Sequence, residues 1–210
     1  MVDDKKANPT PIGFCAFSLT LFVYSMTQAG ATINIDTSPA MGMGLALFYG
    51  GLIELIAGIY ELRRGDNYHA LTFCSYAGFW FGLGSLYVSG SFAFTAQVTA
   101  GDPRNHAFAI FFLAWTIFTL IMLITSIRSN VFHVVFFASL LITYVLFTAS
   151  YYSSSHTDLR RAAGAFGILT SAVGWYIGYA YFMVKGENSY FELPLVDMPT
   201  KGQKKPVEVN

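Results

Sequence analysis

The sequence has few charged residues: Asp, Glu, Lys and Arg make up 11% of its 210 residues, and their formal charges sum to zero. A soluble domain of this length carries about twice that share of charge. A nucleic-acid-binding protein needs a concentrated basic face, which a chain of zero net charge does not favour. The composition therefore points away from both classes and towards a chain that faces lipid.

Residues for metal or redox chemistry are also scarce. Cys15 and Cys74 both lie within apolar runs and are interpreted as buried thiols rather than as a disulfide. The four histidines are scattered near the ends of apolar runs, without metal-ligand spacing: His69, His106, His133 and His156. The sequence has no Gly-x-x-x-x-Gly-Lys-Ser/Thr loop for ATP. We therefore expect no metal site, no cofactor and no enzymatic activity.

Long apolar runs are what the sequence does contain. A bilayer core of about 30 Å takes roughly 20 residues of helix. Six runs reach that length, at residues 11–33, 40–62, 70–98, 108–127, 131–152 and 161–184. Strands of a membrane barrel would be about 10 residues long and would alternate apolar with polar positions, which these runs do not. The sequence predicts an all-α membrane protein, a bundle of six transmembrane helices.

The connections between the runs are short, so we expect one transmembrane domain over residues 11–184. Residues 1–10 would form an N-terminal segment. Residues 185–210 have no apolar period and would form a disordered tail. Most Lys and Arg residues fall on the side that holds both termini, which predicts that both ends are cytoplasmic.

Glycines recur on several predicted helices. Gly44, Gly51 and Gly58 are spaced by seven residues, which predicts one stripe along the second helix. Further glycines lie on the third and sixth runs: Gly78, Gly82, Gly164, Gly167, Gly174 and Gly178. Because close backbone approach supplies much of the packing energy in lipid, we expect these faces to contact neighbouring helices or protomers.

Glu54 lies near the middle of the second run, where an ionised carboxylate costs about 2.5–3.5 kcal/mol on insertion scales. It follows Gly51 by three residues, so we expect it to point inward. It could take up and release a proton, or it could stay protonated and bond a neighbouring helix. Glu61 lies further along, beside Arg63 and Arg64, where an ion pair is expected.

The first run begins Asn8-Pro9-Thr10-Pro11-Ile12-Gly13. Proline is favoured in a first helical turn, and Asn8 is a candidate cap. The free N–H groups and positive dipole end of such a start bind anions, although an ordinary helix start would look the same. Uncharged polar residues within the runs, Thr20 among them, could line a narrow path or could bond their own helices.

These residues carry a resemblance. The segment 8–13 resembles the Asn-Pro-Ala-Pro-Leu-Gly signature of the acetate uptake transporter family. The similarity continues through Phe-Tyr-Gly-Gly at 48–51, Ser-Tyr-Ala-Gly-Phe-Trp at 75–80 and Trp-Thr-Ile-Phe-Thr at 115–119. It covers nearly the whole chain from Asn8 to Lys185, and residues 113–130 are most similar to the fungal or other eukaryotic branch.

The resemblance implies a six-helix protomer within a homohexamer, each protomer with its own path for acetate and related short carboxylates such as succinate. It implies a hydrophobic constriction made by Phe17, Tyr76 and either Leu140 or Ser139. Glu54 departs from the bacterial pattern, which has Gln there, so it is the candidate for proton coupling. The residues expected to line the path or bind the substrate are Asn8, Pro9, Pro11, Gly13, Phe17, Thr20, Tyr76 and Leu140.

The leading hypothesis is a multi-pass plasma-membrane transporter of acetate, either channel-like or a proton symporter. Two alternatives remain open at this stage. One is a membrane signalling or assembly protein that keeps the fold but transports little. The other is a channel for ammonium or neutral solutes.

Overall fold

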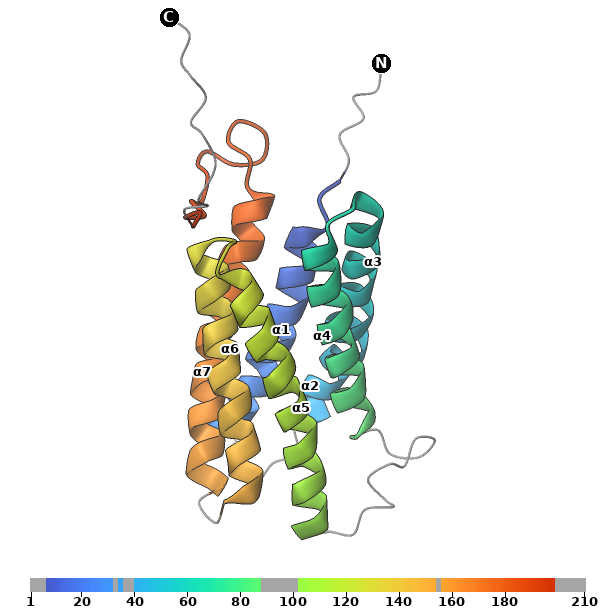
Figure 1. The fold of residues 1–210 in the computed structure, drawn as a ribbon, viewed down its shortest axis with the longest axis vertical. Coiled ribbons are helices and arrows are strands. Elements are labelled where there is room, and N and C mark those ends of the chain that lie inside the picture. The colour runs from blue at the N-terminus through green and yellow to red at the C-terminus, as the bar shows by residue number, and fades with distance from the viewer. Residues whose placement is uncertain (1–6, 32–33, 36–39, 88–101, 154–155, 199–210) are drawn as a thin grey trace, which may run out of the picture.

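The computed structural model describes residues 7–31, 34–35, 40–87, 102–153 and 156–198, and this part of the chain is helical, without a β-strand (Figure 1). The elements are α1 (Thr10–Ala29), α2 (Ala40–Leu45), η1 (Ala46–Ile53), α3 (Glu54–Arg64), α4 (Asn67–Ser85), α5 (Asp102–Ser126), α6 (Val131–Tyr152) and α7 (His156–Phe182). Because α2, η1 and α3 follow one another without a break, the elements make six rods, one for each predicted run. The prediction of an all-α protein is confirmed.

The rods differ from the predicted runs mainly at their ends. The helix of the third run, α4, begins at Asn67 and ends at Ser85, so it is shorter than the run over 70–98. Residues 88–98 of that run lie outside the described residues. Asp66 caps the start of α4 by accepting a hydrogen bond from the His69 N–H, and Gly65, with φ 83°, ends α3 in the left-handed conformation.

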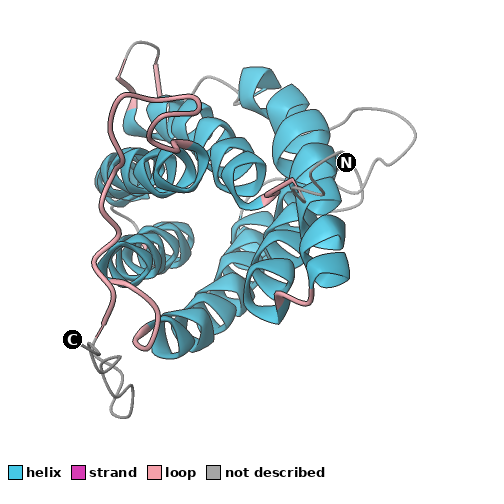
Figure 2. Ribbon diagram, turned by 90° about the horizontal axis from the view of Figure 1, so that it is seen from above, coloured by secondary structure: helices cyan, strands magenta, loops and turns pink. Residues whose placement is uncertain are grey.

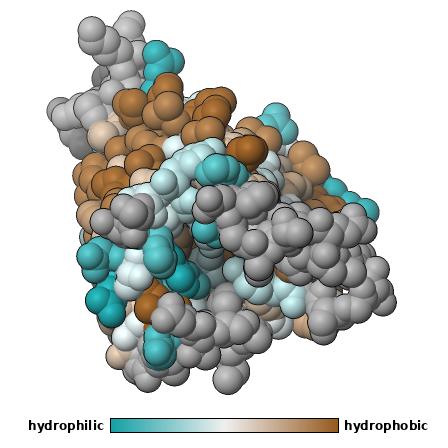
Figure 3. Space-filling model, turned by 90° about the horizontal axis from the view of Figure 1, so that it is seen from below, coloured by the Kyte–Doolittle hydropathy of each residue, from teal (hydrophilic) through white to brown (hydrophobic). Residues whose placement is uncertain are grey.

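The outer surface of the bundle is apolar. Among the described residues, four helices are long and apolar enough to cross a membrane: 10–29, 42–64, 105–126 and 131–152. They expose large apolar side chains, such as Phe48 at 70% and Ile110 and Ile124 at 60%. In the view from below, hydrophobic surface lies along the flank while hydrophilic residues gather at the end of the bundle (Figure 3). Apolar area of this extent suits lipid rather than water.

The rods form a closed ring around a common centre (Figure 2). α1 packs on α7, α7 on α6, and α6 on α5, while η1 and α3 pack on both α1 and α4. α4 meets α5 through aromatic side chains, with the Phe79 and Phe111 rings 5.7 Å apart. The contact between α1 and α7, the first and last helices of the chain, closes the ring.

Glycines of α7 allow its close approach to α1. A Cβ atom at Gly164 would collide with the backbone of Ser25 and Ala29, and one at Gly167 would collide with the Ser25 side chain. Cβ atoms at the two remaining glycines of this helix, Gly174 and Gly178, would also press on α1. The glycine face predicted for the sixth run is therefore a helix-packing face within one chain.

The glycine stripe predicted for the second run is only partly correct. Gly51 and Gly58 pack on α4, against Phe81 and Cys74 respectively. Gly44 is exposed, and a Cβ there would meet no described atom within 4 Å. The reason is the π-helix η1, whose wider turns rotate the residues before it relative to those after it. Gly78 of α4 is likewise exposed and open.

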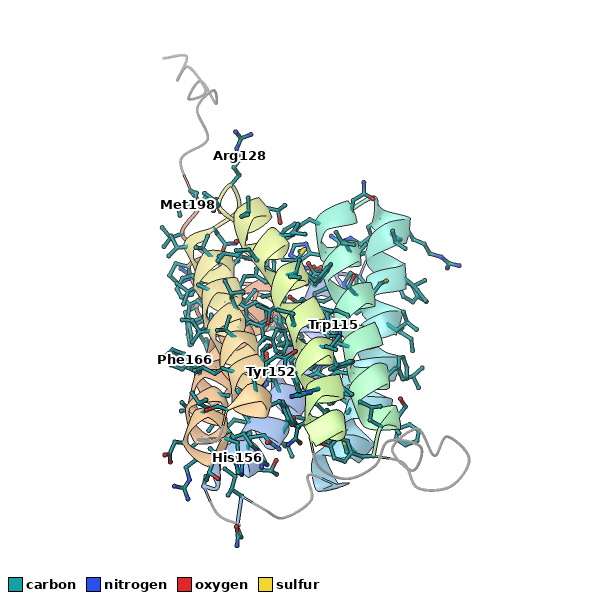
Figure 4. All side chains as sticks on the ribbon, turned by 60° about the horizontal axis from the view of Figure 1, so that its bottom comes forward. Trp115, Arg128, Tyr152, His156, Phe166 and Met198 are labelled. Carbon is teal, nitrogen blue, oxygen red and sulfur yellow. The ribbon has the colours of Figure 1, made fainter. Side chains whose placement is uncertain are left out.

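The chain after α7 folds back on the bundle. The Val131 N–H donates to the Val196 carbonyl at 2.8 Å, and the Met198 N–H donates to the Ser129 carbonyl at 3.0 Å. These bonds hold the segment on the turn between α5 and α6, at the end of the bundle where Arg128 and Met198 are labelled (Figure 4). Of the tail expected over residues 185–210, the structure describes residues 185–198, and residues 199–210 lie outside the described residues.

Candidate functional site

An aromatic cluster fills the centre of the ring. Phe17 of α1 and Tyr76 of α4 are at most 1% exposed, and their ring centroids are 5.2 Å apart. Trp115 of α5, labelled in Figure 4, lies 6.0 Å from Tyr76, and Phe137 of α6 lies 6.4 Å from it. The structure thus brings together Phe17 and Tyr76, for which the family resemblance implies a constriction.

The position of α6 separates the two candidates for the third constriction residue. Ser139 accepts a hydrogen bond from Thr170 of α7 at 2.9 Å and donates to the Phe136 carbonyl, so it faces α7. Leu140 is fully buried and follows Phe137 by three residues, which places both on one face of the helix. Leu140 thus shares the helix face of Phe137 while Ser139 bonds to α7, and which of the two completes the constriction stays a prediction.

The start of α1 is closed by side chains of α3. Asn8 Oδ1 accepts from the Thr10 N–H at 3.2 Å and from Arg64 Nη1 at 2.6 Å. The Thr10 hydroxyl donates to the buried Glu61 carboxylate, and Arg64 lies 3.3 Å from that carboxylate. The ion pair predicted for Glu61 is present with Arg64. The negative charge that suits this helix start is therefore supplied by the chain itself.

The other predicted residues of the first helix have mainly structural contacts. Pro9 is the N-cap of α1, Pro11 lies in its first turn, and the Pro9 carbonyl accepts from the Gly13 N–H at 3.2 Å. A Cβ at Gly13 would collide with the Phe73 ring of α4. Thr20 donates to the Ala16 carbonyl of its own helix at 2.8 Å.

A group of hydrogen-bonding atoms without partners lies next to the constriction. The Trp80 Nε1, Tyr24 Oη and Tyr144 Oη atoms are buried and have no hydrogen-bond partner within the described part of the chain. Trp80 lies 5.8 Å from Phe17 and 6.3 Å from Tyr24, measured between ring centroids. Phe79 joins Trp80 to Tyr144, at 4.8 and 5.2 Å. We call Trp80, Tyr24 and Tyr144 the donor cluster.

The donor cluster is costly unless something occupies it. A buried polar group without a partner costs about 1–3 kcal/mol, and a bound ligand, ion or water that pairs with it would remove that cost. The indole N–H can only donate, so its partner must be an acceptor. Sequence reasoning missed these residues because aromatic side chains in apolar runs look like ordinary core.

Glu54 is fully buried, as predicted, and neither of its carboxyl oxygens has a partner among the described residues. It follows directly after η1 and lies within electrostatic range of Cys74, Tyr76 and Tyr144. π-helical turns are often found at functional sites. The carboxyl group therefore lies beside the central cluster rather than against the lipid.

A cation lies at the end of the bundle where Tyr152 and His156 are labelled (Figure 4). Arg160 Nε donates to Gln28 at 3.1 Å, and its Nη2 donates to the Ile35 carbonyl at 3.0 Å. Arg160 is also within electrostatic range of Tyr24 in the donor cluster. The Arg160 guanidinium and the Asn8 end of α1 therefore lie at opposite ends of the bundle, with the donor cluster between them.

The histidines are not all isolated, as their scattered positions in the sequence had suggested. His69 of α4 and His133 of α6 meet at the end of the bundle where α1 begins, with their Nε2 atoms 3.3 Å apart. They lie on helices that are distant in sequence, so no spacing rule could reveal the pair.

An apolar exterior around a buried aromatic and polar centre defines a multi-pass membrane protein. The chain belongs to the GPR1/FUN34/yaaH family, whose profile matches residues 1–200. The resemblance to acetate uptake transporters carried by segment 8–13 and the later motifs is thereby confirmed.

Two fungal relatives and one solved structure illustrate the match. Accumulation of dyads protein 2 of Saccharomyces cerevisiae is 34% identical over 186 residues, covering 89% of this chain and 64% of that protein. Acetate permease A of Emericella nidulans is 34% identical over 204 residues, covering 93% of this chain and 67% of that protein. The bacterial acetate channel SatP shares the fold, with a TM-score of 0.73 at 21% identity, over 85% of this chain and 93% of its own. The chain thus spans about two thirds of the length of these fungal relatives.

Proposed function

We propose that this protein carries acetate and related short carboxylates across the plasma membrane, through the centre of the helical ring. The observation that carries the proposal is the donor cluster behind the Phe17–Tyr76 constriction. A carboxylate accepts hydrogen bonds, and the Trp80 N–H requires an acceptor. An aromatic constriction favours small solutes. Hydroxyl and indole donors, with the nearest described cation, Arg160, bonded to Gln28 and Ile35, would hold a carboxylate weakly enough to release it.

The proposal includes six spans, cytoplasmic termini and a homohexamer. Six helical rods and the bias of Lys and Arg support the first two features. The exposed face around Gly78 supports contacts between protomers, because an open glycine permits close helix approach in lipid. The names of Acetate permease A and of the SatP channel support the choice of acetate.

Uptake of radiolabelled acetate by transporter-deficient cells tests the function, at about pH 5 and about pH 7. We expect uptake above that of empty-vector cells, and competition by propionate or formate. Uptake equal to the empty vector at both pH values would refute acetate transport. Competition by ammonium but not by carboxylates would favour the ammonium channel instead.

Replacing Phe17 by alanine is expected to widen the range of acids that compete with acetate. The ring lies 5.2 Å from Tyr76 and 5.3 Å from Phe136, so its removal opens the packing between α1, α4 and α6. The measurement is competition of acetate uptake by a series of acids of increasing length. Leu19→Ala, a change on the outward face of the same helix, is the control. An unchanged competition series for Phe17→Ala would locate the constriction elsewhere.

Glu54→Gln is expected to leave acetate uptake intact but to flatten its dependence on external pH. Gln keeps the shape of the side chain and cannot exchange a proton. The measurement is the initial uptake rate across a series of external pH values. If the pH profile of the variant equals that of the wild type, Glu54 has a structural role and proton coupling lies elsewhere.

A further inference from the structure

A chain of four polar side chains links α4 to α6 at the end of the bundle where α1 begins. Asp66 and Asn130 cap the two helices, and each contacts the histidine three residues further on. The two histidines, His69 and His133, then meet at Nε2 and are 8% and 0% exposed. We call these four residues the histidine latch.

The caps determine where the imidazole hydrogens lie. Asn130 Oδ1 accepts the His133 backbone N–H at 3.0 Å, so this atom is the amide oxygen. His133 Nδ1 lies 2.8 Å from the same oxygen and must therefore donate to it. His69 Nδ1 donates to the Asp66 carboxylate at 2.7 Å in the same way. Both histidines thus carry a hydrogen on Nδ1.

The contact between the two Nε2 atoms then requires one more proton. A neutral imidazole carries a single N–H, so two neutral rings with Nδ1–H would point their lone pairs at each other. At 3.3 Å that arrangement is repulsive, whereas one added proton makes it an N–H···N hydrogen bond. Burial by itself raises the pKa of Asp66, but the hydrogen bonds from His69 outweigh it and lower that pKa below its ordinary value. Asp66 is therefore an anion that balances the added charge.

Among the described residues, no cationic side chain contacts the rings of the histidine latch. Tyr68 of α4 and Tyr181 of α7 lie 5.3 and 5.7 Å from the His69 ring. α1 contributes the apolar ring of Phe14. Two acidic residues lie within electrostatic range of Tyr181: Asp197, after α7, and Glu61 of α3, which forms an ion pair with Arg64. These neighbours are neutral or negative, which suits a bound proton.

We propose that Asp66, His69, His133 and Asn130 form a proton-binding site that holds α4 against α6, and that loss of the proton lets these helix ends part. Phe14 couples the site to the centre, because it packs 5.3 Å from His133 and 5.5 Å from Phe136. An effect on transport rests on the proposed function, whereas the proton site itself does not. If the site faces the cytoplasm, imported acid would lower the cytoplasmic pH, protonate the site and so close the transport path.

Nitrogen NMR of the histidine-labelled protein in lipid nanodiscs tests the proton site directly. We expect Nδ1–H on both rings, and in acid a coupling between the two Nε2 atoms that disappears as the pH is raised. His133→Gln and His69→Gln should each abolish the coupling, while His106→Gln, on the opposite end of the bundle, should leave it. A fixed Nε2–H tautomer at every pH would overturn the proposal. So would stoichiometric zinc held between the rings.

Acetate flux into proteoliposomes tests the effect on transport, with internal pH varied at constant external pH. Because the protonated fraction changes by up to about tenfold per pH unit, we expect wild-type flux to rise several-fold as the interior becomes alkaline. Flux through His133→Gln should not depend on internal pH, and His106→Gln should behave as the wild type. Wild-type flux independent of internal pH would overturn the latch. Absence of any wild-type flux with an intact NMR signal would refute the proposed function and leave the proton site standing.

Discussion

Replacing Gly164 by valine is expected to remove most of the folded protein. The new Cβ would collide with the Ala29 N and Ser25 carbonyl atoms of α1, and backbone atoms cannot rotate aside. Overpacking of ordinary side chains costs about 1–3 kcal/mol, and a clash with a neighbouring backbone should reach or exceed the upper end. The measurement is the yield and thermal stability of the detergent-solubilised protein, followed by size-exclusion chromatography.

Gly44→Val is the matched control for this prediction. It makes the same change within a helix, but at a position where a Cβ would meet no described atom within 4 Å. The control should keep the yield and melting temperature of the wild type. Equal stability of the Gly164 and Gly44 variants would show that α1 and α7 do not pack as closely as described.

Trp80→Phe and Tyr144→Phe are each expected to raise the acetate concentration that half-saturates uptake by about 10- to 100-fold. Each removes one buried donor, and a hydrogen bond to a charged group contributes about 1.5–3 kcal/mol. The remaining ring keeps the packing against Phe79. The measurement is the concentration dependence of uptake, corrected for the amount of protein in the membrane.

Tyr60→Phe is the control for the donor cluster, because Tyr60 is exposed on the outer surface. It loses a hydroxyl without touching the centre and should keep wild-type kinetics. Wild-type half-saturation in both the Trp80 and Tyr144 variants would exclude the donor cluster as the carboxylate site.

The sequence predicts the six rods well, because run length and the bilayer thickness leave few alternatives for long apolar segments. It could not predict η1, since nothing in Ala46–Ile53 distinguishes a π-helix from an α-helix before packing is known. That π-helix also explains why Gly44 does not share a helix face with Gly51 and Gly58. The folded-back segment at residues 194–198 was missed because its contacts are backbone bonds to a distant turn.

The site was predictable only where the chain carries a local signal. Phe17 and Tyr76 were found through motifs, and Glu54 through the cost of a carboxylate in a span. The donor cluster and the histidine latch each combine residues from different helices, and neither has a spacing that marks it. Partner-free Trp and Tyr atoms become visible only when every neighbour is placed.

The contact between α1 and α7 has a consequence for how the protein is made. The first helix leaves the ribosome long before the last, and at about 5–20 residues per second the delay is roughly 10 s. During that time the polar atoms of Ser18 and Ser25 on α1 lie in a nascent chain whose final neighbour does not exist. The contact between α1 and α7, and with it the closed ring, therefore forms only at the end of synthesis.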